Sequence, residues 1–168
     1  VLNSAALLYD LNPTNKDSEA EAFFTRNKDI VSVVLFEQNK ELINQKFFME
    51  NGITLTMLDS FIVICDKNIK KKQKGITKLS NASPYFGMPL LSMIFQLKTP
   101  AGPQTVLVLF SSQSLLDSFS TGSINLSCLV NDSGDVLLHS DLEQVLKGGN
   151  IGNDYLIQSL NASAQKGE

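Results

Sequence analysis

The stretch Val31-Ser32-Val33-Val34-Leu35-Phe36 decides the fold class, because it is an unbroken run rich in β-branched and aromatic residues. This composition is typical of a central β-strand. A polar turn over residues 37–40 follows, and residues 41–48 are predicted to return as the second strand of a hairpin. Since hairpin-length connections join antiparallel strands, the chain is predicted to contain an antiparallel sheet.

More strands are expected downstream, where apolar runs alternate with turn residues. The predicted strands are residues 76–81, 90–97, 105–110, 124–130 and 136–139. Residues 83–87 are expected to form a loop. Helices are predicted from apolar spacing and capping residues at 1–11, 18–26, 54–74, 112–119 and 153–164. Together these elements predict an α+β domain with a central antiparallel sheet of about five strands, a long N-terminal helix and flanking helices.

Size and charge narrow the class of protein. The chain has 168 residues, enough for one domain, and a net charge of −3, which argues against a nucleic-acid-binding surface. Its longest apolar stretches, residues 31–36 and 106–110, are far shorter than the ~20 residues that cross a bilayer. The two cysteines, Cys65 and Cys128, lie singly in apolar surroundings and are predicted to be buried free thiols.

Catalysis and metal binding find little support in the sequence. The single histidine, His139, follows two leucines at the end of a predicted strand, and no nucleophile motif accompanies Ser83, Ser111 or Cys128. We therefore expect no enzyme activity, no cofactor and no metal site. A structural role is expected for His139, and pH sensing is kept as a hypothesis because imidazole titrates near neutrality. The lysine run at 67–74 is interpreted as a solvated helix end, with docking to anionic lipid headgroups as the alternative.

Three further features define a resemblance. The first is the hairpin of residues 31–48 after a polar helix. The second is Ser83-Pro84-Tyr85-Phe86-Gly87-Met88-Pro89, followed by two strands and a short helix. The third is the closing hairpin Cys128-Leu129-Val130-Asn131-Asp132-Ser133-Gly134-Asp135-Val136-Leu137-Leu138-His139-Ser140-Asp141. In order and spacing the chain resembles the Cache family, the PAS-like sensor domains that bacterial receptors hold outside the cytoplasm.

The resemblance implies a single sensor domain of a bacterial inner- or plasma-membrane receptor. Residues 1–17 would form a helix leading from a membrane anchor outside this fragment, 18–160 the core and 161–168 a C-terminal extension. The output module would be a histidine kinase, a nucleotide cyclase or a chemotaxis transducer. Dimerisation would use the N-terminal helix, through the face that holds Leu2, Ala5, Ala6 and Tyr9. The arginine-rich motif of family members that bind amino acids is missing here, since Arg26 is the one arginine.

A small-molecule site is predicted on the face of the sheet, near the second stretch. The residues expected to bind the ligand supply hydroxyl, amide and apolar groups: Asn81, Ser83, Tyr85, Phe86, Met93 and Phe110. For the apolar members of this set, a place in the core is the competing interpretation. The alternative function is a profilin- or longin-like module that binds partner proteins and no metabolite.

Overall fold

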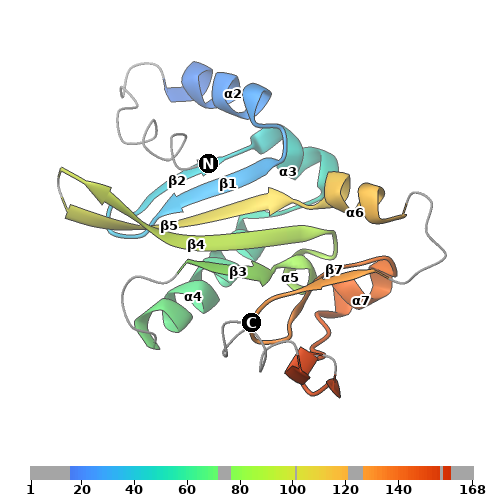
Figure 1. Cartoon of the computed structure of the whole chain (residues 1–168). Coiled ribbons are helices and arrows are strands. Elements are labelled where there is room, and N and C mark those ends of the chain that lie inside the picture. The colour runs from blue at the N-terminus through green and yellow to red at the C-terminus, as the bar shows by residue number, and fades with distance from the viewer. Residues whose placement is uncertain (1–15, 72–76, 101, 121–126, 156, 160–168) are drawn as a thin grey trace. The chain divides into compact units, whose positions relative to one another are not determined.

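The computed structural model describes residues 16–71, 77–100, 102–120, 127–155 and 157–159 (Figure 1). The elements run, in chain order, α2 (Lys16–Arg26), β1 (Ile30–Leu35), β2 (Lys40–Ile43), α3 (Gln45–Asn51), α4 (Leu55–Lys71), β3 (Lys78–Asn81), α5 (Ser83–Phe86), β4 (Leu90–Thr99), β5 (Gly102–Ser111), α6 (Gln113–Ser120), β6 (Cys128–Val130), β7 (Val136–His139) and α7 (Leu142–Lys147). The predicted α+β class is therefore confirmed.

Five strands form one antiparallel sheet in the order β2-β1-β5-β4-β3. Strand β1 lies between β2 and β5, with Val33 opposite Leu42 on one side and Val108 on the other. The pairing with β5 shifts between Ile30 and Ser32, where a β-bulge interrupts the ladder. Strands β6 and β7 form a separate two-stranded sheet.

The chain divides into two compact units, and the expectation of a single sensor domain stays a prediction. Unit 1 comprises Val1–Lys78 and Ser92–Ser111, and unit 2 comprises Leu79–Leu91 and Ser112–Glu168. The predicted N-terminal helix over residues 1–11, with its expected dimer face, lies outside the described residues.

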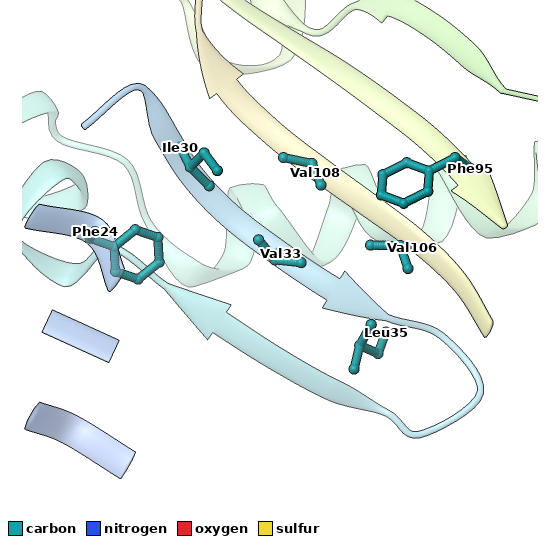
Figure 2. Packing of buried hydrophobic residues seen from close by; sticks show 7 residues of the cluster. All are labelled: Phe24, Ile30, Val33, Leu35, Phe95, Val106 and Val108. Atoms are coloured by element: carbon teal, nitrogen blue, oxygen red, sulfur yellow. The ribbon is translucent and has the colours of Figure 1, made fainter. Parts of the chain in front are cut away.

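The core of unit 1 includes a cluster on one face of its sheet, shown in Figure 2. Phe24 of α2 packs against side chains from the three strands β1, β4 and β5, which are Ile30, Val33, Leu35, Phe95, Val106 and Val108. All seven residues are buried. Because side chains alternate along a strand, Leu107 and Leu109 point to the opposite face.

Helix α4 covers that opposite face of unit 1. It passes behind strands β4 and β5 in Figure 1, and its residues Leu58, Phe61 and Cys65 are buried. These three follow one another at spacings of three and four, so they share one side of the helix. The helical spacing seen in the sequence therefore predicted both the helix and its buried face.

The turn between β1 and β2 is attached to β5 by a carboxylate. Glu37 accepts hydrogen bonds from the backbone N–H of Thr105 at 2.6 Å and from its hydroxyl at 2.7 Å. On β2, burial and then the negative charge of Asp59 raise the pKa of Glu41 above its usual value. The two bonds from Glu37 therefore fix the position of this turn against β5.

Two predicted elements were wrong in kind or extent, and one helix was missed. The return strand expected at 41–48 ends at Ile43, and α3 begins at Gln45 because the Asn44 side chain accepts from the N–H of Phe47 as an N-cap. Residues 83–86 form the short helix α5, where a loop was expected. Helix α7 was not predicted at all. Of the helix expected at 153–164, residues 155 and 157–159 are helical, and residues 156 and 160–164 lie outside the described ranges.

Candidate functional site

Asn81, at the end of β3, holds three segments of unit 2 together. Its Nδ2 donates to the carbonyl oxygens of Val136 at 3.0 Å and Val145 at 2.7 Å, and its Oδ1 accepts from the N–H of Ser83 at 2.8 Å. These bonds link strand β7, helix α7 and the start of α5. The amide that was expected to contact a ligand is therefore engaged with the backbone.

Ser83 is fully buried, and its hydroxyl is also engaged with the backbone. The Oγ donates to the carbonyl of Leu90 at 3.1 Å and accepts from the N–H of the same residue at 3.0 Å. Helix α5 follows, with Pro84 in its first turn and Gly87 ending it at φ 68°. The short helix thus has both ends defined by residue type, since proline suits the first helical positions and glycine suits a left-handed C-cap.

The two aromatic side chains of α5 differ in exposure. Phe86 is buried, whereas Tyr85 is 46 % exposed. Among the four predicted ligand-binding residues of this segment, Tyr85 is the one with an exposed side chain. A phenol offers an apolar ring together with one hydroxyl that donates and accepts, which suits an uncharged or weakly polar organic ligand.

The other two predicted ligand-binding residues, Met93 and Phe110, belong to unit 1. Both are half-buried and pack against the cluster of Figure 2. They lie on strands β4 and β5, on the face of the sheet that holds this cluster. The six residues are therefore divided between the two units.

His139 ends β7 and organises the start of α7. Its Nδ1 accepts from the N–H of Asp141 at 2.9 Å, so the proton of the neutral ring is carried on Nε2. Asp141 in turn caps α7 by accepting from the N–H of Glu143 at 3.0 Å. The pH-sensing hypothesis stays a prediction: protonation of Nδ1 would break its bond to Asp141. An NMR titration of the ring that leaves the Asp141 amide unmoved would contradict it.

Cys128 is exposed, which corrects the prediction that both cysteines are buried. It lies on β6 directly opposite His139 in the ladder. The prediction was wrong because Cys128 and its neighbour Leu129 are both exposed, although side chains of consecutive strand residues point to opposite faces and the composition of β6 is apolar. Cys65 is buried as expected, and burial raises the pKa of its thiol to about 11.

This contrast predicts selective labelling of the two thiols. Raising the pKa of Cys65 from the ordinary 9.0 to about 11 lowers its thiolate fraction at neutral pH by about a hundredfold. A maleimide or disulfide reagent should therefore label Cys128 rapidly and Cys65 only after denaturant is added. Mass spectrometry of the labelled peptides checks this, and equal rates for both thiols in the folded protein would contradict the burial of Cys65.

A polar network around the β6–β7 turn was not predicted as a unit. The Asp135 carboxylate accepts from Asn131 Nδ2 at 2.9 Å and from Asn150 Nδ2 at 2.7 Å. Asn131 Oδ1 accepts from the N–H groups of Ser133 and Asp135. The sequence identified the turn through its Asn-Asp-Ser-Gly residues, but no local signal identifies Asn150 as the partner.

The described residues show neither a metal cluster nor a simple membrane span. Within them, no group of three or more His, Cys, Asp or Glu side chains is placed to hold a metal ion. No single helix of the described ranges has the length and apolar character to cross a bilayer. Helix α3 and residues 55–69 of α4 have the necessary length and apolar character only when they are taken together, and this pair of helices is bent by 108°.

Comparison of the chain with protein-family models, with curated proteins and with solved structures finds no match.

Proposed function

We propose that the chain is a Cache-like sensor domain, the extracytoplasmic ligand-binding input of a membrane-bound receptor. The five-stranded antiparallel sheet supports this proposal, because helices α2 and α4 pack on opposite faces of its unit 1 strands. The proposed role is binding without catalysis. Ser83 in unit 2 was considered as a catalytic nucleophile, but its hydroxyl is buried and hydrogen-bonded to the backbone of Leu90.

The observation that carries the proposal is the position of Asn81. One amide joins the segment that presents Tyr85 to both β7 and α7. A small molecule that contacts Tyr85 would therefore shift the geometry of α7 through bonds that cannot stretch far. A ligand changes the balance between two such states only if it binds one of them better. The signal would leave unit 2 through α7 and the chain that follows it.

A thermal-shift screen tests this function. The panel contains organic acids, amino acids, amines, purines and divalent cations. A ligand present at about a hundred times its dissociation constant adds ~2.7 kcal/mol to the stability, which amounts to several degrees in a domain of this size. We expect at least one organic compound to raise the melting temperature.

Two tyrosine variants then locate the site. Tyr85→Ala should abolish the shift, while Tyr155→Ala, which removes a 79 % exposed tyrosine of the same unit, should leave it unchanged. A shift that survives Tyr85→Ala would place the ligand elsewhere. A silent panel would contradict ligand sensing and leave the partner-binding alternative.

That alternative is a profilin- or longin-like module, and one observation in unit 1 favours it. Met49 of α3 is 77 % exposed and Leu55, the first residue of α4, is 60 % exposed. Exposed apolar side chains that form a contiguous patch mark protein-interaction sites, and these two residues are six positions apart in the chain. If the chain is a partner-binding module, replacing both residues with serine should abolish capture of the partner protein. If it is a ligand sensor, the same replacement should leave the Tyr85-dependent rise in melting temperature unchanged.

A further inference from the structure

Strand β6 has one edge bonded to β7 and one edge without a strand in the described part of the chain. Toward β7, the N–H of Ser140 donates to the carbonyl of Ser127, and the N–H of Asn131 donates to the carbonyl of Asp135. The register of the pair shifts between Leu129 and Val130, and the extra residue, Leu137, lies on β7. Bonded residues therefore still alternate along β6, and Leu129 also bonds toward β7. The backbone N–H and C=O groups of Cys128 and Val130 therefore point away from the ribbon.

The chemistry of this edge differs from that of the other sheet. The edge strands of the five-stranded sheet are β2 and β3, and they carry Lys40, Glu41 and Lys78. Charges of this kind keep a strand edge from pairing with another chain. Around β6, by contrast, residues 122–131 contain no charged side chain. Leu129 is 42 % exposed although it lies in the middle of the strand.

We propose that two copies of the chain associate through antiparallel pairing of β6 with β6 of the second copy. A twofold axis at Leu129 sets Cys128 opposite Val130 of the second copy and Val130 opposite Cys128 of the second copy. All the outward backbone groups of both residues are then bonded. The two-stranded ribbons become one four-stranded sheet, which is more stable in water than an isolated hairpin.

The second copy is the favoured occupant because the edge is complementary to itself. Twofold pairing places each residue opposite itself or a near neighbour, so a charged strand would meet like charge. Residues 122–131 avoid this repulsion. The two Leu129 residues form a directly opposed pair with Cα atoms about 4.5 Å apart, and each covers the exposed apolar surface of the other.

Sedimentation velocity of the full chain over a concentration series tests the association. We expect a monomer–dimer equilibrium that Leu129→Lys shifts toward monomer by about tenfold or more in dissociation constant, since two ammonium groups then face each other. Leu142→Lys, at a leucine of α7 that is 45 % exposed, is the matched control and should leave the dimer intact. Circular dichroism confirms that both variants remain folded.

Cysteine cross-linking tests the register. In a Cys128→Ser background, Leu129→Cys should form an intermolecular disulfide under mild oxidation, because a Cα separation of about 4.5 Å suits the bond. Val130→Cys in the same background should not, because it faces position 128 of the second copy. A chain that is monomeric throughout, or a dimer that Leu129→Lys leaves intact, overturns the proposal. A monomer that binds a different strand at this edge overturns it too.

Discussion

Replacing Gly134 with alanine is expected to lower the free energy of unfolding by about 3 kcal/mol or more. Gly134 lies in the β6–β7 turn at φ +79°, where a side chain is strained. A Cβ built there would also overlap the Cα and N atoms of Gly152, which are backbone atoms and cannot rotate away. The contact between the turn and residues 150–152 would have to open, and urea denaturation measures the loss.

Gly52→Ala is the matched control for that substitution. Gly52 ends α3 at φ +67°, and a Cβ there meets nothing within 4 Å. It therefore suffers the same backbone strain without the overlap, and should cost about 1–2 kcal/mol. The difference between the two variants isolates the close approach of Gly134 to Gly152. Equal losses would show that the two glycine backbones are not in contact.

Asn81→Ala is expected to cost about 2–4 kcal/mol, because it removes all three of the bonds that hold α5, β7 and α7 together. The carbonyl of Val145, a fully buried residue, loses its 2.7 Å donor, and an unsatisfied buried carbonyl is costly. Asn81→Asp should cost as much or more, because a carboxylate oxygen would then face two carbonyl oxygens. Thermal unfolding followed by circular dichroism measures both variants.

Asn51→Ala provides the comparison. Asn51 also donates from Nδ2 to a backbone carbonyl, that of Phe47 at 2.9 Å, but it does so on the surface. Asn51→Ala should lower the free energy of unfolding by no more than about 0.5 kcal/mol, as most substitutions of exposed residues do. If Asn81→Ala were as mild as Asn51→Ala, the amide of Asn81 would not join the three segments, and the signalling route proposed above would lose its basis.

The strands were predictable wherever side-chain pattern and pairing agree. Residues 31–36 predicted β1 to within one residue at each end, and 136–139 predicted β7 with its observed bounds. The prediction failed for residues 44–48, because Phe47 and Phe48 have high strand propensity while the cap at Asn44 starts a helix. The caps at Asn44 and Gly52, together with the burial of Phe48, favour the helix over the strand that the composition of the segment indicates.

The candidate site was predictable in residue type but not in the use of those residues. Asn81 and Ser83 were chosen because amides and hydroxyls recognise ligands, yet their partners Val136, Val145 and Leu90 are backbone groups. Two of these partners, Val136 and Val145, lie more than fifty residues away along the chain, and local sequence patterns do not predict contacts between such distant residues. Tyr85 remains a candidate ligand-binding residue because its side chain is exposed. The sequence could not predict that exposure, since it depends on α5, a helix where a loop was expected.

The pairing of β1 with β5 has a consequence for how the chain is made. Val33 pairs with Leu42 nearby and with Val108 far along the chain. The hairpin can form early, but its second edge must wait until β5 has left the ribosome. Contacts between distant segments slow folding, and an unpaired apolar strand can meet another nascent chain first. The yield of folded protein should therefore depend on how fast residues 44–105 are translated.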